Sequence, residues 1–219
     1  MIKLNLGCGS VRPLGWINTD SSLNANIQKI PFIGKKITKL FNPVAYDSEN
    51  FIYMNLNKAW SYKDNSIDVV YASHLFEHLT LKSANLFLSE AYRTLKPGGV
   101  LRIVVPDLYK IAKKYISEYE NNTYTNTTTE FIMWAINMHR EGQYGNNIGF
   151  IKKQVLEIMG YPHQHKFMYD EKSLIKLFEN SNFKNILSLT YGKSDYINEI
   201  NEVEGMTESY LSVYIEAKK

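Results

Sequence analysis

The sequence predicts an α/β fold built on a mainly parallel sheet of seven strands. Short apolar runs alternate along the chain with segments of helical periodicity, which is typical of units in which a helix connects two parallel strands. The first apolar run ends in Gly7-Cys8-Gly9, a turn in which glycines let the backbone bend tightly and approach a ligand. The chain has 219 residues, 44% of them hydrophobic, so we expect one domain over 1–219.

The expected strands are rich in Ile, Val, Leu, Phe and Tyr. In chain order they lie at residues 2–6, 16–19, 51–54, 67–72, 99–105, 185–191 and 209–217. The clearest helix falls between the fourth and fifth strands, where apolar residues recur at helical spacing from Ala84 to Leu95. Thr80 is the expected N-cap of this helix, and Lys96-Pro97-Gly98-Gly99 is the expected stop.

Two segments interrupt this alternation. Residues 21–50 mix apolar residues with lysines around Pro31 and Gly34, and they are interpreted either as a lid or cover helix or as a basic surface for a membrane or an anionic ligand. Residues 108–168 contain helical segments around the polar spacer at 120–130. We expect both insertions to overhang the carboxyl edge of the sheet and to form the substrate cover.

Composition sets the cellular context and excludes some classes of site. A single cysteine excludes an internal disulfide framework and a multi-cysteine metal site, and it fits a reducing compartment. There is no charged leader followed by a cleavage site and no apolar run long enough to span a membrane, so a cytoplasmic protein is expected. The net charge of +3 is too small to predict nucleic-acid binding.

Polar residues follow several of the expected strands, where ligands of open α/β sheets bind. Asp20 closes the second strand, and a carboxylate there can accept both hydroxyls of an adenosine ribose. Asn55 follows the third strand, His74 the fourth and Asp107 the fifth. These positions predict a nucleoside-containing ligand at the carboxyl edge.

Several motifs in a fixed order resemble the class I S-adenosylmethionine-dependent methyltransferases, in particular a bacterial branch. The motifs are LNLGCG, GWxNxD, DxSxDxVxxSHxxEH, ExxRxLKPGGxLR and VPD. They lie at residues 4–9, 15–20, 64–78, 90–102 and 105–107. The resemblance covers residues 3–110 strongly and continues faintly to about residue 187.

The resemblance implies a Rossmann-like seven-stranded sheet of order 3-2-1-4-5-7-6, with the last strand antiparallel and helices on both faces. It also implies S-adenosyl-L-methionine as cofactor, with the methionine part at the glycine turn and the adenosine near the second and third strands. The cofactor-binding residues expected from it are Leu6, Gly7, Cys8, Gly9, Asp20, Asn55, Leu56, Ser73 and His74. Between Gly9 and Asp20 there is too little chain for the usual crossover helix, so a loop is expected there.

Methylation of a hydroxyl group requires that its proton be removed, so a general base is sought. Histidine suits this role near neutral pH. His74 after the fourth strand, Asp107 after the fifth and His165 before a helix that Asp170 could cap are the catalytic candidates. A small-molecule acceptor is expected, preferably a sugar nucleotide or a precursor of a surface glycan, because the bacterial branch is associated with polysaccharide synthesis.

Other interpretations of the same residues are open. His74 and His78 with Glu77 form an H-x-x-E-H pattern, but no third zinc ligand is evident and no metal is expected. A dinucleotide-dependent oxidoreductase would carry a third glycine where Arg12 stands. A cofactor-binding protein without activity, or a methyltransferase of protein or nucleic acid, is the alternative function. Cys8 has no base beside it in the sequence and is expected to be inert.

Overall fold

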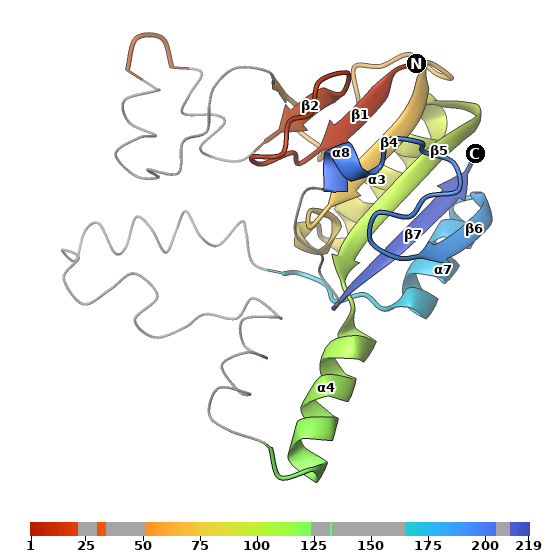
Figure 1. Ribbon diagram of the computed structural model, residues 1–219. Coiled ribbons are helices and arrows are strands. Elements are labelled where there is room, and N and C mark those ends of the chain that lie inside the picture. The colour runs from red at the N-terminus through yellow and green to blue at the C-terminus, as the bar shows by residue number, and fades with distance from the viewer. Residues whose placement is uncertain (22–29, 34–50, 124–131, 133–164, 205–210) are drawn as a thin grey trace.

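The computed structural model describes residues 1–21, 30–33, 51–123, 132, 165–204 and 211–219. Within these residues the chain forms a seven-stranded sheet of order β3-β2-β1-β4-β5-β7-β6 (Figure 1). The strands are β1 (Lys3–Leu6), β2 (Ile17–Asp20), β3 (Ile52–Tyr53), β4 (Ile67–Ser73), β5 (Leu95–Pro106), β6 (Lys184–Leu189) and β7 (Ser212–Lys218). β7 runs antiparallel to both of its neighbours, β5 and β6, and the other strand pairs are parallel. The predicted fold class and strand order are confirmed.

Alternate residues of the central strands face two separate cores. Val70 of β4 belongs to the larger core with Phe87 of α3 (Leu81–Thr94) and Phe178 of α7 (Glu171–Asn180). Val69 and its neighbours pack on the opposite face with Val203 of α8 (Asn201–Glu204). Helices therefore cover both faces of the sheet, as expected (Figure 1).

The predicted helix ends are confirmed at α3 and α7. Thr80 Oγ1 accepts a hydrogen bond from the Ser83 amide, and Asp170 forms a capping box with Ser173. One boundary differs. β5 begins at Leu95, which pairs with Ile67. The Lys96–Gly99 segment, which was expected only to end the helix, is therefore also part of the strand. The chain between Gly9 and Trp16 contains no helix, as its length predicted.

The two insertions, 21–50 and 108–168, lie mostly outside the described residues. The second begins with α4 (Leu108–Glu120), which projects from the carboxyl end of β5 (Figure 1). Of its residues only Ile111 is buried. No helix of the described part is both long and apolar enough to cross a membrane.

Candidate active site

The glycine turn after β1 has one closed side and one open side. Gly7 and Gly9 have left-handed backbone conformations, with φ of 66° and 50°, which residues with side chains rarely adopt. A β-carbon on Gly7 would lie 3.0 Å from Cδ1 of Leu75, whereas one on Gly9 would meet no described atom within 4 Å. The turn therefore packs against the protein at Gly7 and leaves room for a ligand at Gly9.

The carboxyl ends of β1, β2 and β4 meet beside this turn. Leu6, the last residue of β1, is in register with Thr19 of β2 and with Ala72 of β4. The next residues, Asp20 and Ser73, are the last residues of β2 and β4, so they lie level with the start of the glycine turn. Asp20 is 7% exposed. The structure thus brings these predicted cofactor residues to one edge of the sheet.

The segment after β3 is only partly arranged as expected. Asn55 Oδ1 accepts a hydrogen bond of 2.9 Å from the Asn57 amide, which closes a local turn. The Leu56 side chain is buried in the larger core, together with Trp60. The roles expected for Asn55 and Leu56 at the adenine ring remain predictions.

Cys8 is a buried thiol between the two glycines. Its amide donates a hydrogen bond of 2.9 Å to the Thr19 carbonyl, which ties the turn to β2. Burial, with a further contribution from nearby Asp20, raises the pKa of the thiol to about 11. Since the thiolate is the reactive form, this environment does not activate Cys8 as a nucleophile.

His74 directly follows β4 and has an unusual backbone conformation. Its φ is 49°, a left-handed value that is uncommon for a residue with a side chain and that often accompanies functional sites. The Nδ1 atom lies 3.4 Å from Oε1 of Glu77, and the Nε2 atom lies 3.3 Å from Oγ of Ser212. The imidazole is 46% exposed, whereas the Glu77 side chain is 1% exposed. A buried carboxylate therefore supports an accessible imidazole.

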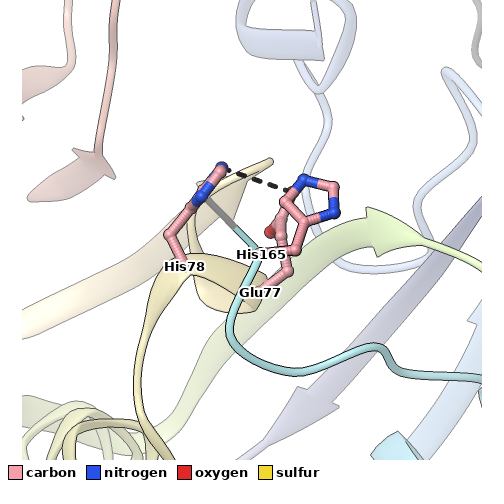
Figure 2. Close-up of side chains that lie close together, drawn as sticks. All are labelled: Glu77, His78 and His165. Atoms are coloured by element: carbon pink, nitrogen blue, oxygen red, sulfur yellow. Dashed lines mark ion pairs between the residues drawn. The ribbon is translucent and has the colours of Figure 1, made fainter. Parts of the chain in front are cut away.

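Two further histidines face the same carboxylate. Glu77 and His78 belong to the short 3₁₀ helix η1 (Phe76–His78), and His165 comes from the segment before α7. Oε1 of Glu77 lies 3.9 Å from Nε2 of His78 and 3.8 Å from Nε2 of His165. Figure 2 shows these three side chains converging from the two segments. Burial lowers the pKa of the His165 imidazole, so this ring favours the neutral form.

Backbone contacts hold the His165 segment against η1. The amides of Lys166 and Phe167 donate to the carbonyl of Glu77, at 2.8 and 3.2 Å. Tyr169, further along the segment, packs its ring against Phe76 with a centroid distance of 5.2 Å. The position of His165 beside Glu77 is therefore fixed by the hydrogen bonds and the packing of the residues that directly follow it.

The side chain of Asp107, the third catalytic candidate, forms hydrogen bonds with neighbouring residues of the chain. Its Oδ1 accepts hydrogen bonds from the Tyr109 and Lys110 amides, and this caps α4. The side chain is 4% exposed, and Oδ2 lies 3.7 Å from Nζ of Lys110. The structure thus supplies a structural reason for Asp107 at this position, and its role toward the acceptor remains a prediction.

The comparison with protein families agrees with the fold and with the position of the candidate site at the carboxyl edge of the sheet. Residues 4–103 match the family model described as a methyltransferase domain. This range carries most of the resemblance noted in the sequence, and the strand order around it is the one which that resemblance implies. The match and the strand order support a class I S-adenosylmethionine-dependent methyltransferase. They imply S-adenosylmethionine as the cofactor and methyl transfer as the activity.

Several solved structures are similar to this chain. A SAM-dependent methyltransferase of Thermotoga maritima, described as a possible histamine N-methyltransferase, is 17% identical, with a TM-score of 0.48 over 100% of this chain and 82% of that chain. A SAM-dependent methyltransferase of Archaeoglobus fulgidus is also 17% identical, with a TM-score of 0.48 and coverages of 100% and 86%. One from Methanosarcina mazei is 15% identical, with a TM-score of 0.48 and coverages of 99% and 91%. No curated protein matches the chain.

The described residues fit this cofactor. The open side of the turn at Gly9 offers space that a β-carbon would fill, and backbone amides at the end of a parallel strand suit a polar ligand. Asp20 presents a carboxylate where the ribose hydroxyls are expected. The cofactor, when bound, supplies a methyl group activated on a sulfonium, so the protein's own work is to position the acceptor.

Glu77 is the site residue that sequence reasoning did not select. It is buried at the centre of His74, His78 and His165, and no described residue donates a hydrogen bond to either of its side-chain oxygens. The signal was present in the H-x-x-E-H spacing, which places the acid between two histidines. What the spacing could not show is that His165 joins them. His139 and His163, two other histidines in the sequence, lie outside the described residues.

Proposed function

We propose that this methyltransferase transfers a methyl group to a hydroxyl of a small molecule, with a sugar or a surface-glycan precursor as the preferred acceptor. The observation that carries the proposal is the pair formed by His74 and Glu77. An accessible imidazole whose other nitrogen faces a buried carboxylate is a suitable general base, because the carboxylate orients the ring and stabilises its protonated form.

The proposed reaction uses His74 as the proton acceptor. Its Nε2 atom, which lies 3.3 Å from Oγ of Ser212, takes the proton of the acceptor hydroxyl as the oxygen lone pair attacks the methyl carbon. The carbon–oxygen bond forms while the carbon–sulfur bond breaks, and that electron pair stays on sulfur. Glu77 then faces an imidazolium, which its carboxylate stabilises. His74 follows β4 directly beside the glycine turn, which supports its placement near the reacting methyl group.

The cellular setting belongs to the same proposal. A single buried cysteine fits the reducing cytoplasm of a bacterium, and the resemblance to the SHxxEH branch favours polysaccharide synthesis. The low net charge favours a small acceptor over nucleic acid. The substrate cover is proposed to come from 21–50 and 108–168.

The test is a product assay with the purified chain, labelled S-adenosylmethionine and a panel of sugar nucleotides, simple glycosides and biogenic amines. We expect label to enter a sugar hydroxyl, identified by mass spectrometry. His74→Gln should lower kcat by about 10²–10⁴-fold, and calorimetry with S-adenosylhomocysteine measures separately how much His74 contributes as a cofactor contact. Lys82→Gln is the matched control, since Lys82 is exposed on α3. Methylation confined to amines, or full activity in His74→Gln, would overturn the proposal.

A further inference from the structure

The cluster of Glu77, His78 and His165 has the composition and spacing of a metal site. One ligand atom from each of the three residues can be chosen so that all lie within 4.8 Å of one another. Oε1 of Glu77 lies 3.8 Å from Nε2 of His165 and 3.9 Å from Nε2 of His78, and Figure 2 shows the three side chains together. Two ligands at zinc distances in a tetrahedron are about 3.3 Å apart, so small side-chain rotations close the site.

A second observation points to a missing ligand. The Glu77 side chain is 1% exposed, yet neither of its carboxylate oxygens accepts a hydrogen bond from a described residue. The Nδ1 atom of His165 is also buried and has no hydrogen-bond partner among the described residues. A buried polar group without a partner costs about 1–3 kcal/mol, and more when it is charged. Native proteins rarely tolerate this unless a bound group satisfies the site. An ion beside Glu77 would supply the absent positive charge.

We propose that Glu77, His78 and His165 bind one divalent transition-metal ion of the zinc class. Two imidazoles and one carboxylate form the three-ligand set of catalytic zinc sites, which leave a coordination position open. Imidazole nitrogens suit zinc and its transition-metal neighbours, whereas magnesium prefers oxygen ligands. The sequence alone argued against zinc because it offered no third ligand. The backbone hydrogen bonds from Lys166 and Phe167 to Glu77 bring that ligand, His165, into place.

The location gives the ion a part in the reaction, and this part of the inference rests on the proposed function. Glu77 is shared between the cluster and His74, whose Nδ1 atom is 3.4 Å away. An acceptor hydroxyl in the open coordination position would have a lowered pKa, which eases transfer of its proton to His74. The acceptor oxygen would also be held at the edge where the methyl group arrives.

The binding test does not depend on activity. The full chain, stripped with EDTA and dialysed, is titrated with zinc by calorimetry and with cobalt by visible absorption. We expect one ion per chain and cobalt bands of a low-coordinate site. Glu77→Gln and His165→Gln should each weaken binding by at least about 10²-fold. Glu179→Gln, which alters an exposed carboxylate on α7, is the matched control and should bind as the unmodified chain does.

Circular dichroism checks that each variant is folded, and thermal unfolding gives a second readout. Zinc should raise the unfolding temperature of the unmodified chain and of Glu179→Gln, but not of Glu77→Gln, because a ligand that binds only the folded state stabilises it. Absence of stoichiometric binding, or equal binding by the ligand variants and the control, would overturn the metal site.

His74→Gln separates the metal site from the proposed function. We expect this variant to keep zinc affinity while losing methyl transfer. If His165→Gln loses zinc but transfers methyl groups at the unmodified rate, the catalytic part of the inference is overturned and the proposed function stands. If no sugar hydroxyl is methylated although zinc binds as described, the proposed function fails and the metal site stands.

Discussion

Two clusters of charged side chains, one in the sheet and one at its carboxyl edge, differ in how their buried polar atoms are satisfied. The first is centred on Arg102 of β5, which is fully buried and contacts Glu204 at 2.6 Å and Glu216 at 3.2 Å. The second is centred on Glu77 and its three histidines at the carboxyl edge. Both bury a charged group almost completely, and both use residues from distant parts of the chain.

The first cluster is complete. Besides Arg102, Glu204 accepts a hydrogen bond from the Gly192 amide, and Glu216 accepts hydrogen bonds from the Ser194 hydroxyl and the Tyr196 amide. The Glu77 carboxylate has no such donors among the described residues, and its nearest imidazole nitrogen is 3.4 Å away. A buried charge whose hydrogen-bond partners are all present has a structural role. A buried charge that lacks such partners indicates a ligand-binding site.

The largest expected effect comes from breaking the complete cluster. Arg102→Met leaves two buried glutamates unpaired, so the free energy of unfolding should fall by about 3–5 kcal/mol. Urea denaturation followed by circular dichroism measures this. The control, Lys96→Met, breaks an ion pair with Asp68 that is partly exposed and should cost at most about 1 kcal/mol. Equal losses in the two variants would show that the Arg102 cluster is not the stabilising one.

The opposite result is expected at Glu77. In metal-free protein, Glu77→Gln removes a buried charge without removing a hydrogen bond from any described donor, so the free energy of unfolding should stay the same or rise, by up to about 3 kcal/mol. Methyl transfer should fall by about 10²-fold or more, because His74 loses the group that supports its protonated form. Urea denaturation and initial rates measure the two quantities. A loss of stability as large as that of Arg102→Met would remove the distinction between the clusters.

The two clusters also differ in what the sequence could reveal. Motif spacing predicted the strands, the glycine turn, Asp20 and His74, because local periodicity and the ends of parallel strands determine those positions. His165 was proposed as a base, but its approach to Glu77 depends on backbone hydrogen bonds across the fold. No sequence pattern predicts the Arg102 cluster, because Glu204 and Glu216 resemble ordinary surface charges in the sequence. Contacts between distant residues depend on register and loop paths, which periodicity does not encode.

A smaller effect should appear in the pH dependence of stability. Burial, opposed by Glu77 and reinforced by His78 and His74, lowers the pKa of His165 below its usual 6.5. The unfolded chain therefore binds the proton first, and His165 makes the folded state less stable as pH falls below 6.5, with no contribution above it. In EDTA, the loss of unfolding free energy between about pH 7 and about pH 5 should be smaller in His165→Gln than in Glu179→Gln. Identical slopes would contradict the burial of His165 beside Glu77.

The smallest expected effect on activity comes from substituting Cys8. This thiol is buried like the charged groups of the two clusters, but it can remain uncharged. With a pKa of about 11, the thiol stays protonated at neutral pH and does not need a charged partner. Cys8→Ala should keep methyl transfer within about threefold of the unmodified chain, as is usual for a substitution outside a catalytic role. In the folded protein, iodoacetamide at about pH 8 should modify Cys8 about 10²-fold more slowly than a free peptide thiol. Rapid alkylation that S-adenosylhomocysteine blocks, or loss of activity in both Cys8→Ala and Cys8→Ser, would instead make the thiol part of the chemistry.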